Sequence, residues 1–261
     1  MTRIVQQHPT LAARSLPRFV LPVLMALLLT ANAADAALTT GACLAQKRVA
    51  WGTLRKCQAT EEAKQLKGKP ADLAQCLTKL QTALAKITAK ATKALISCRY
   101  RDNGDGTVTD YDTGLQWEKK DGTDGAPALG NPHDVDNRYS WSLAANIFRT
   151  GTAFTDFLAR LDDSESSDGV TEAPCFVGHC DWRLPTIVEL RGIVDLTAFA
   201  CGVGSPCIAP VFGPTVALNY WSATTVATNP LIAWFVYFDG GVVFSGGKAG
   251  LNYVRAVRGG L

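Results

Sequence analysis

The chain has 261 residues, a formal net charge of +3, 47% hydrophobic residues and eight cysteines. The spacing of those cysteines excludes a structural zinc site, which needs short paired spacings. The charge is unevenly divided. Residues 38–98 carry 11 basic and 3 acidic side chains, a net +8, whereas residues 99–261 carry 12 basic and 19 acidic side chains, a net −7. A charge break of this size predicts two modules, of which the second is long enough to bury a core of its own.

Residues 1–36 have the pattern of a secretory signal peptide. Three arginines precede the apolar run 19–29, and the small-x-small patterns at 31–33 and 34–36 match what signal peptidase cleaves. The apolar run is too short to cross a bilayer comfortably. We therefore expect a mature protein that is secreted, periplasmic or at the cell surface and does not span the membrane. A lipoprotein anchored at Cys43 stays open, because the preceding residues loosely resemble a lipobox.

Residues 37–98 are predicted to form a basic, cysteine-rich helical hairpin. They are rich in Ala, Leu, Lys and Gln, which favour helix, and the stretch 66–72, with its Gly and Pro, divides them into two helices. Trp51 is expected to pack between these helices. The lysines are typical of a solvated helical face, and contact with a polyanion is the alternative. No specific nucleic-acid partner is predicted.

Eight cysteines in an exported chain are expected to form disulfides, and eight allow 105 pairings. In the hairpin, the two cysteines of each helix are 14 and 22 residues apart and return to within about 40° of one helical face. Antiparallel packing of the helices then brings them opposite each other. The predicted bridges are Cys43–Cys98 and Cys57–Cys76 in the hairpin, and the local pairs Cys175–Cys180 and Cys201–Cys207 in the larger module, where cross-pairing stays open.

The larger module, residues 99–261, opens with a predicted β-hairpin. Gly-rich turns flank 107–109 and 115–118, which are expected to be its strands. The Asp-Asn-Gly-Asp-Gly run at 102–106 superficially suggests calcium, but glycines stand where an EF-hand loop needs its third and fifth ligands. Turn formation is therefore the expectation. No cofactor is predicted, and calcium stays open as an alternative.

Two helical segments are expected next. Residues 140–147 are predicted to form a capped helix with Leu143 and Ile147 facing inward. The Phe and Leu residues of 154–161 predict a second, short amphipathic segment. The acidic run 162–169 is expected to be a solvated loop, with binding of a hard cation as the alternative.

The stretch 181–195 is the one around which the larger module is organised. Thr186 and Glu189 stand three apart in the capping-box pattern, directly after a proline, so a helix is expected to begin there. Asp181 and Arg183 are expected to form an ion pair that ties the preceding loop, with ligand binding as the alternative. The residues predicted to face the core are Ile187, Leu190 and Val194.

The last third of the chain is predicted to be β-rich. Strands are expected at 219–225, 231–238 and 242–244, with a tight turn at Asp239-Gly240, and a last strand is expected at 252–258.

Seven short motifs occur in order along the larger module: Asp105–Asp110, Thr113–Trp117, Trp141–Ala145, Asp181–Leu190, Tyr220–Thr224, Ala233–Gly240 and Val254–Arg258. Each motif alone is weak, but the ordered series is specific. It resembles the Lcl C-terminal domain family, named after the Legionella collagen-like protein and also called DUF1566. The resemblance covers roughly residues 99–258 and leaves the helical hairpin outside.

The resemblance implies an exported bacterial domain with an α+β, C-type-lectin-like fold, here preceded by the disulfide-linked hairpin. The founding member of the family is an adhesin whose domain binds sulfated glycosaminoglycans, while most relatives have no assigned activity. The net −7 of the larger module makes it a poor surface for a sulfated polymer. The +8 hairpin is therefore the better candidate for contact with a polyanion.

The first functional hypothesis is a non-catalytic binding or adhesion protein of the bacterial cell envelope, with a glycan or a surface protein as ligand. Loops of the larger module offer aromatic, amide and cationic side chains to such a ligand. Most of the tryptophans at 117, 141, 182, 221 and 234 are nevertheless expected to be core residues. The candidate ligand-binding residues are Asn219, Trp221, Lys248, Asn252 and Arg255.

An enzyme is the second hypothesis and a structural envelope protein is the third. Residues 183–186 resemble a motif of formylglycine-generating enzymes, but those need a reactive cysteine pair near the C-terminus, and no cysteine follows Cys207. For a hydrolase, His133 and His179 are the remaining conventional bases, and the chain has no Gly-x-Ser-x-Gly motif. A metal at His133 and its neighbouring aspartates is less favoured than a solvated loop. We therefore predict neither a catalytic nor a metal site.

Overall fold

The computed structural model describes residues 39–94, 97–122, 124–144, 146–163 and 175–259. The signal peptide expected at 1–36 and most of the acidic run 162–169 lie outside these residues. Residues Leu38–Leu261 group into one compact unit. Within the described ranges, no helix combines the length and the apolar character needed to cross a membrane.

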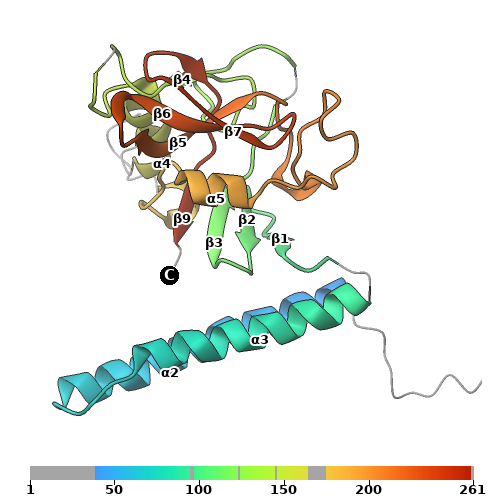
Figure 1. Ribbon diagram of the computed structural model, residues 1–261, viewed down its shortest axis with the longest axis vertical. Helices are drawn as coiled ribbons and strands as arrows, with labels where there is room; N and C mark the ends of the chain where they lie inside the picture. The colour runs from blue at the N-terminus through green and yellow to red at the C-terminus, as the bar shows by residue number, and fades with distance from the viewer. Residues whose placement is uncertain (1–38, 95–96, 123, 145, 164–174, 260–261) are drawn as a thin grey trace, which may run out of the picture. The chain divides into compact units, whose positions relative to one another are not determined.

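The predicted helical hairpin is present, drawn from blue to green in Figure 1. Helix α2 (Thr40–Leu66) and helix α3 (Leu73–Lys93) are joined by a short turn. Thr39 and Asp72 cap the two helices, because their side-chain oxygens accept hydrogen bonds from backbone N–H groups of the first turns, at 3.1 and 2.8 Å. Both boundaries follow from local sequence.

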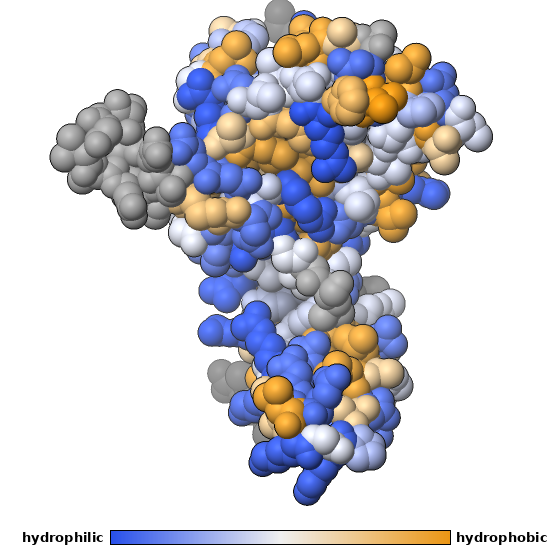
Figure 2. Space-filling view, turned by 90° about the vertical axis from the view of Figure 1, so that its left-hand side faces the viewer, coloured by the Kyte–Doolittle hydropathy of each residue, from blue (hydrophilic) through white to orange (hydrophobic). Residues whose placement is uncertain are grey.

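The core between α2 and α3 is small. One apolar cluster surrounds Leu54 and Leu80, and a second surrounds Ile87. The nested disulfides Cys43–Cys98 and Cys57–Cys76 confirm the predicted pairing. They stabilise a helical pair whose core alone is too small. Figure 2, which looks onto the turn end of the hairpin, shows many hydrophilic side chains there, with apolar patches between them.

The larger module begins with a four-stranded antiparallel sheet, whose strand order is β1-β2-β3-β9. The β2–β3 pair confirms the predicted β-hairpin. Trp117 stands opposite Val108 on one side and Val257 on the other, and its side chain is fully buried. The strands are β1 (Tyr100–Asp102), β2 (Thr107–Asp110), β3 (Leu115–Glu118) and β9 (Val257–Gly259).

The run 102–106 forms the connection between β1 and β2. The Asp102 carboxylate accepts a hydrogen bond from the Gly104 backbone N–H at 2.9 Å, and the Asp105 carboxylate accepts one from the Thr107 N–H at 3.0 Å. Gly104 has a φ of +79°, which favours glycine. Both carboxylates therefore shape the turn.

A second group of strands lies mostly between residues 219 and 252, and it confirms the predicted β-rich character. A three-stranded antiparallel sheet has the order β5-β6-β7, and two short strands, β4 and β8, pair with each other. The strands are β5 (Asn219–Val226), β6 (Asn229–Tyr237), β7 (Val242–Gly247), β4 (Tyr139–Ser140) and β8 (Leu251–Asn252).

The single last strand expected at 252–258 is instead two strands, β8 and β9. The chain leaves its pairing with β4 after Asn252 and reaches its pairing with β3 at Val257. The segment between them is buried and satisfies its backbone elsewhere: the Tyr253 carbonyl accepts from the Trp221 N–H at 2.9 Å, and the Ala256 carbonyl accepts from the Glu118 N–H at 3.0 Å. Between β8 and β9, these long-range hydrogen bonds take the place of the continuous strand pairing that the sequence suggested.

The helix expected after Pro185 is α5 (Ile187–Gly192), and both hydrogen bonds of the capping box between Thr186 and Glu189 are present. Leu190 is fully buried. The ion pair expected between Asp181 and Arg183 is wrong. Arg183 forms a bidentate pair with Glu189, at 2.8 and 2.7 Å, and Asp181 pairs with Arg258 at 2.6 Å.

The helix expected at 140–147 does not form over the described part of that range, since Ser140 belongs to β4 and irregular backbone follows. Leu143 and Ile147, expected to face inward, are exposed. The Ser142 hydroxyl instead donates to the Ala144 carbonyl, a local bond that competes with helix. The segment expected at 154–161 is helical, as the π-helix η1 (Ala153–Leu158) and the short helix α4 (Ala159–Asp162).

Two apolar clusters fill the larger module, one around Trp117 and Leu190 and one around Trp141 and Trp221. Two local disulfides pin loops at their edges, which confirms the local pairing: Cys175–Cys180 and Cys201–Cys207. Helices and antiparallel sheets in one chain make this an α+β protein, which four disulfides stabilise.

Candidate functional site

Three of the five residues expected to bind a ligand are buried in the protein. Trp221 is 1% exposed, and its indole N–H donates to the Tyr139 carbonyl at 3.1 Å. Lys248 is also 1% exposed, and its Nζ lies 3.7 Å from the centroid of the Trp141 ring. These side chains therefore organise the core and offer no surface to a ligand.

Arg255 is the third buried residue. Its guanidinium donates to the Glu118 and Phe212 carbonyls, at 2.7 and 2.9 Å, and to the Thr215 hydroxyl at 3.0 Å. Burial lowers its pKa, and the nearby Tyr220 and Glu118 act in the opposite direction. Arg255 was expected to bind a ligand, but it lies in the buried segment between β8 and β9 and is 1% exposed.

Asn219 and Asn252 are partly buried and lie close together, because the Asn219 carbonyl accepts from the N–H of the neighbouring Tyr253 at 3.0 Å. Among the described residues, neither side-chain amide has a hydrogen-bond partner. Both amides remain available to a ligand, but the aromatic face expected between them is buried.

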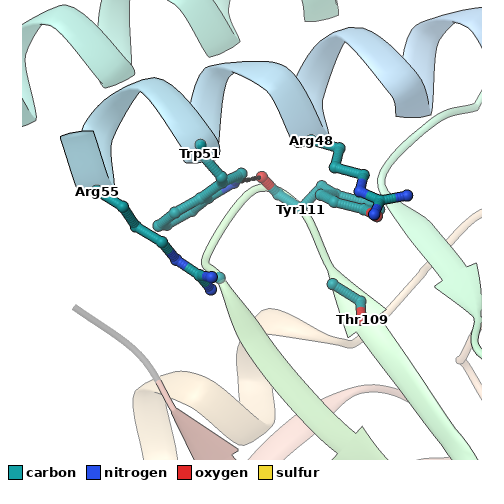
Figure 3. A pocket seen from close by; sticks show the side chains of 7 residues that line it. Arg48, Trp51, Arg55, Thr109 and Tyr111 are labelled. Atoms are coloured by element: carbon teal, nitrogen blue, oxygen red, sulfur yellow. Dashed lines mark hydrogen bonds between the residues drawn. The ribbon is translucent and has the colours of Figure 1, made fainter.

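A cleft of about 310 Å³ lies where α2 meets the β2–β3 hairpin, and we call it the junction cleft (Figure 3). Helix α2 supplies four lining residues at helical spacings of three and four, which place them on one face. The β2–β3 hairpin supplies the other three. The lining residues are Arg48, Trp51, Gly52, Arg55, Thr109, Tyr111 and Gly114.

Two polar contacts attach α2 to the larger module beside this cleft. The Trp51 indole N–H donates to the Tyr111 carbonyl at 2.8 Å, the bond marked by the dashed line in Figure 3. Lys47 is 1% exposed and forms an ion pair with Asp112. A buried lysine needs such a partner, because an unpaired charge there is costly.

Gly114 allows the Trp51 ring to approach the turn closely. Its φ is +75°, and a Cβ built on it would lie 2.5 Å from the Cη2 atom of Trp51. Behind the turn, Arg99 binds Asp110 through two hydrogen bonds of 3.0 and 2.7 Å. Burial by itself lowers the pKa of Arg99, but the hydrogen bonds to Asp110 together with the charges of Tyr100, Asp110 and Asp112 outweigh it and raise the pKa. The floor of the cleft is therefore fixed by local contacts.

The two arginines of the cleft are free. Arg48 and Arg55 are both exposed, and within the described part of the chain neither makes a hydrogen bond or an ion pair. They are seven residues apart on α2, about 10.5 Å along the helix axis. Figure 3 shows them on either side of Trp51, extending from α2 toward the β2–β3 side.

Free guanidinium groups beside aromatic rings suit an anionic ligand with a ring or another flat apolar face. Arginine binds carboxylate, sulfate or phosphate through two N–H groups at once, and the rings of Trp51 and Tyr111 border the same space. The Thr109 hydroxyl adds a hydrogen-bonding group. The lining of the cleft is thus suited to binding an anion, and it includes no histidine, carboxylate or cysteine that could act as a general base.

A second charged cluster is closed and structural. Glu118 is fully buried, with Lys120 Nζ at 2.8 Å and His133 Nδ1 at 3.0 Å from the same carboxylate oxygen. Burial raises the pKa of Glu118, but Lys120 and His133, with Arg255 farther away, outweigh it and lower the pKa to about 2. His133 is thus engaged by Glu118. Across the described residues, no cluster of three or more His, Cys, Asp or Glu side chains has the geometry to hold a metal ion.

Comparison with known families confirms the resemblance expected from the sequence motifs. The model of the Lcl C-terminal domain matches residues 106–258, so the chain belongs to the Lcl C-terminal domain family. No curated protein matches the chain. The helical hairpin lies outside the matched residues, and it provides both arginines of the junction cleft.

The junction cleft was missed from sequence, although one signal for it exists. Arg48, Trp51 and Arg55 stand at spacings of three and four, so a single helical face presents two cations around an aromatic ring. Nothing in the sequence marks Tyr111 and Gly114, some 60 residues later, as the opposing wall.

Proposed function

We propose that this protein is an exported, non-catalytic binding protein of the bacterial cell envelope, with a C-type-lectin-like domain, and that it holds an acidic glycan in the junction cleft. The observation that carries the proposal is the pair of free arginines, Arg48 and Arg55, around the Trp51 and Tyr111 rings. A charged group on the glycan would pair with a guanidinium, and the apolar face of its sugar ring would stack on an aromatic side chain.

Export is supported by the cysteine chemistry. All eight cysteines are paired in four disulfides, a density typical of secreted and periplasmic proteins and rare in reducing compartments. A signal peptide at 1–36 would deliver the chain there. Disulfides that close the helical hairpin also keep Arg48 and Arg55 on a rigid support.

A non-catalytic role is supported by the absence of reactive groups in the cleft. Arginine stays protonated and cannot act as a base, and the cleft contains no histidine, carboxylate or cysteine. Chemistry of the formylglycine-generating type needs a reactive cysteine pair, and the chain has no free thiol.

A structural envelope protein is the second candidate, and the docking of the hairpin favours it. The Lys47–Asp112 ion pair and the Trp51 contact would hold the hairpin at a set angle to the larger module, as a spacer requires. In that case Arg48 and Arg55 would bind an acidic segment of a surface protein.

The test is binding of the purified protein to an array of neutral and acidic glycans, with and without calcium. The variant Arg48→Gln/Arg55→Gln is compared with Lys86→Gln/Lys90→Gln, which removes the same charge from exposed positions on α3. We expect acidic glycans to bind without calcium, and the arginine variant alone to lose binding. Equal losses in both variants would mean diffuse charge attraction, which salt screens. Absence of binding to every glycan on the array would favour the structural role.

A further inference from the structure

Several large apolar side chains are exposed to solvent around Lys248, and we call this set the apolar rim. Each is between 43% and 70% exposed, although soluble proteins seldom keep so many together. The apolar rim consists of Leu143, Ile147, Phe148, Leu231 and Leu251.

Hydrogen bonds to Lys248 hold these residues in one neighbourhood. The Lys248 carbonyl accepts from the Trp141 and Ser142 N–H groups, each at 3.0 Å, and the Lys248 N–H donates to the Leu231 carbonyl at 3.2 Å. Its Nζ lies 3.4 Å from the Ile147 carbonyl oxygen. Strand β8 brings in Leu251, which pairs with Ser140. Segments far apart in sequence therefore meet at one place.

Two charged side chains are placed in this neighbourhood by their contacts, Arg149 and Lys248, and both are cationic. Arg149 follows Phe148 directly and is exposed, and its guanidinium lies 5.5 Å from the Phe154 ring centroid. Burial, and then the nearby charge of Arg149, lower the pKa of Lys248. Within the described ranges, neither cation forms an ion pair with a carboxylate. The module as a whole is acidic, with a net −7, so the exposed Arg149 beside these apolar side chains carries the charge opposite to that of the module.

We propose that the apolar rim docks onto a phospholipid surface that contains anionic head groups. Leucine, isoleucine and phenylalanine side chains would enter the boundary between head groups and acyl chains, and Arg149 would pair with a lipid phosphate. The combination favours lipid because an anionic lipid surface takes up exposed apolar side chains and attracts the adjacent cation at the same time. This proposal goes beyond the proposed function and does not depend on the junction cleft.

The first experiment places a reporter in the apolar rim of the full chain. The variant Phe148→Trp is mixed with vesicles of phosphatidylcholine alone, or of phosphatidylcholine with phosphatidylglycerol. We expect its emission, measured against the wild type, to shift to the blue with the anionic vesicles and to be quenched by brominated acyl chains. Flotation of the protein without that shift or quenching would mean attachment through the basic hairpin, and it would overturn the proposal.

The second experiment measures flotation of variants with the same vesicles. Leu143→Ser/Phe148→Ser should reduce binding by roughly tenfold or more, because two exposed apolar groups no longer enter the lipid. Arg149→Gln should remove the preference for anionic lipid. Phe199→Ser is the control, since Phe199 is 95% exposed and lies outside the apolar rim. Three results would each overturn the proposal. They are an equal loss of vesicle binding with Phe199→Ser, no flotation of the wild type, and a dimer in solution that dissociates in Phe148→Ser.

Discussion

Docking of the helical hairpin onto the larger module makes a quantitative prediction at Gly114. The Gly114→Ala variant places a Cβ 2.5 Å from Cη2 and 2.9 Å from Cζ3 of the Trp51 ring. Overpacking of this kind costs about 1–3 kcal/mol. The left-handed φ of +75° costs an alanine about 1–2 kcal/mol more. We therefore expect Gly114→Ala to lower the free energy of unfolding by about 2–5 kcal/mol.

The partner variant Trp51→Ala separates these two contributions. Removing the indole costs its bond to the Tyr111 carbonyl, about 1 kcal/mol, together with the packing of a half-buried ring. Without the ring, the new Cβ of Gly114→Ala no longer meets it, so Gly114→Ala should cost only the φ contribution of about 1–2 kcal/mol. The expected coupling between the two substitutions is therefore about 1–3 kcal/mol.

The assay is chemical unfolding of the four proteins in this cycle, followed by circular dichroism. Gly104→Ala is the matched control, because Gly104 has a φ of +79° and no atom within 4 Å of the Cβ position. Its cost should be about 1–2 kcal/mol whether or not Trp51 is present. If Gly114→Ala costs the same in both backgrounds, Trp51 does not pack on Gly114, and the reasoning behind the junction cleft is refuted.

Three further predictions concern the core, the hairpin and α5. Glu118→Gln should destabilise the protein by about 3–5 kcal/mol, because Lys120 is left buried without its partner. The pKa of Glu118 is lowered to about 2 in the folded protein, against about 4.3 in the unfolded chain. The ionised carboxylate should therefore stabilise the fold fully above a pH of about 4.3, and this stabilisation should be lost as the pH falls toward about 2. Acid unfolding of Glu118→Gln should lack that loss. Cys57→Ser/Cys76→Ser should cost about 3 kcal/mol in thermal unfolding, and peptide mapping without reductant should still find the other three bridges. Thr186→Ala should cost about 1 kcal/mol by chemical unfolding, through loss of the α5 cap; no change would mean that Glu189 alone holds the turn.

The sequence by itself determined those features that depend on residues near one another in the chain. Helical spacing placed the hairpin cysteines on matching faces, and Thr186 with Glu189 marked the start of α5. Gly-rich turns marked the β2–β3 hairpin. The ordered motifs were sufficient for the family, because they preserve the sequence of such local features. Capping, turn formation and helical periodicity depend on interactions between residues that are close in the sequence, so the sequence alone is enough to predict them.

Only the tertiary structure decided which polar and aromatic groups are covered. Arg255 was expected to bind a ligand, but it became a buried donor to carbonyls 43 and 137 residues away. The segment 140–147 has a helical pattern, but the Trp141 backbone N–H donates to the Lys248 carbonyl, and this tertiary hydrogen bond takes the place of the expected helix. The junction cleft joins Trp51 to Tyr111, 60 residues later. Such contacts depend on how whole elements pack, and burial energy outweighs local propensity when the two conflict.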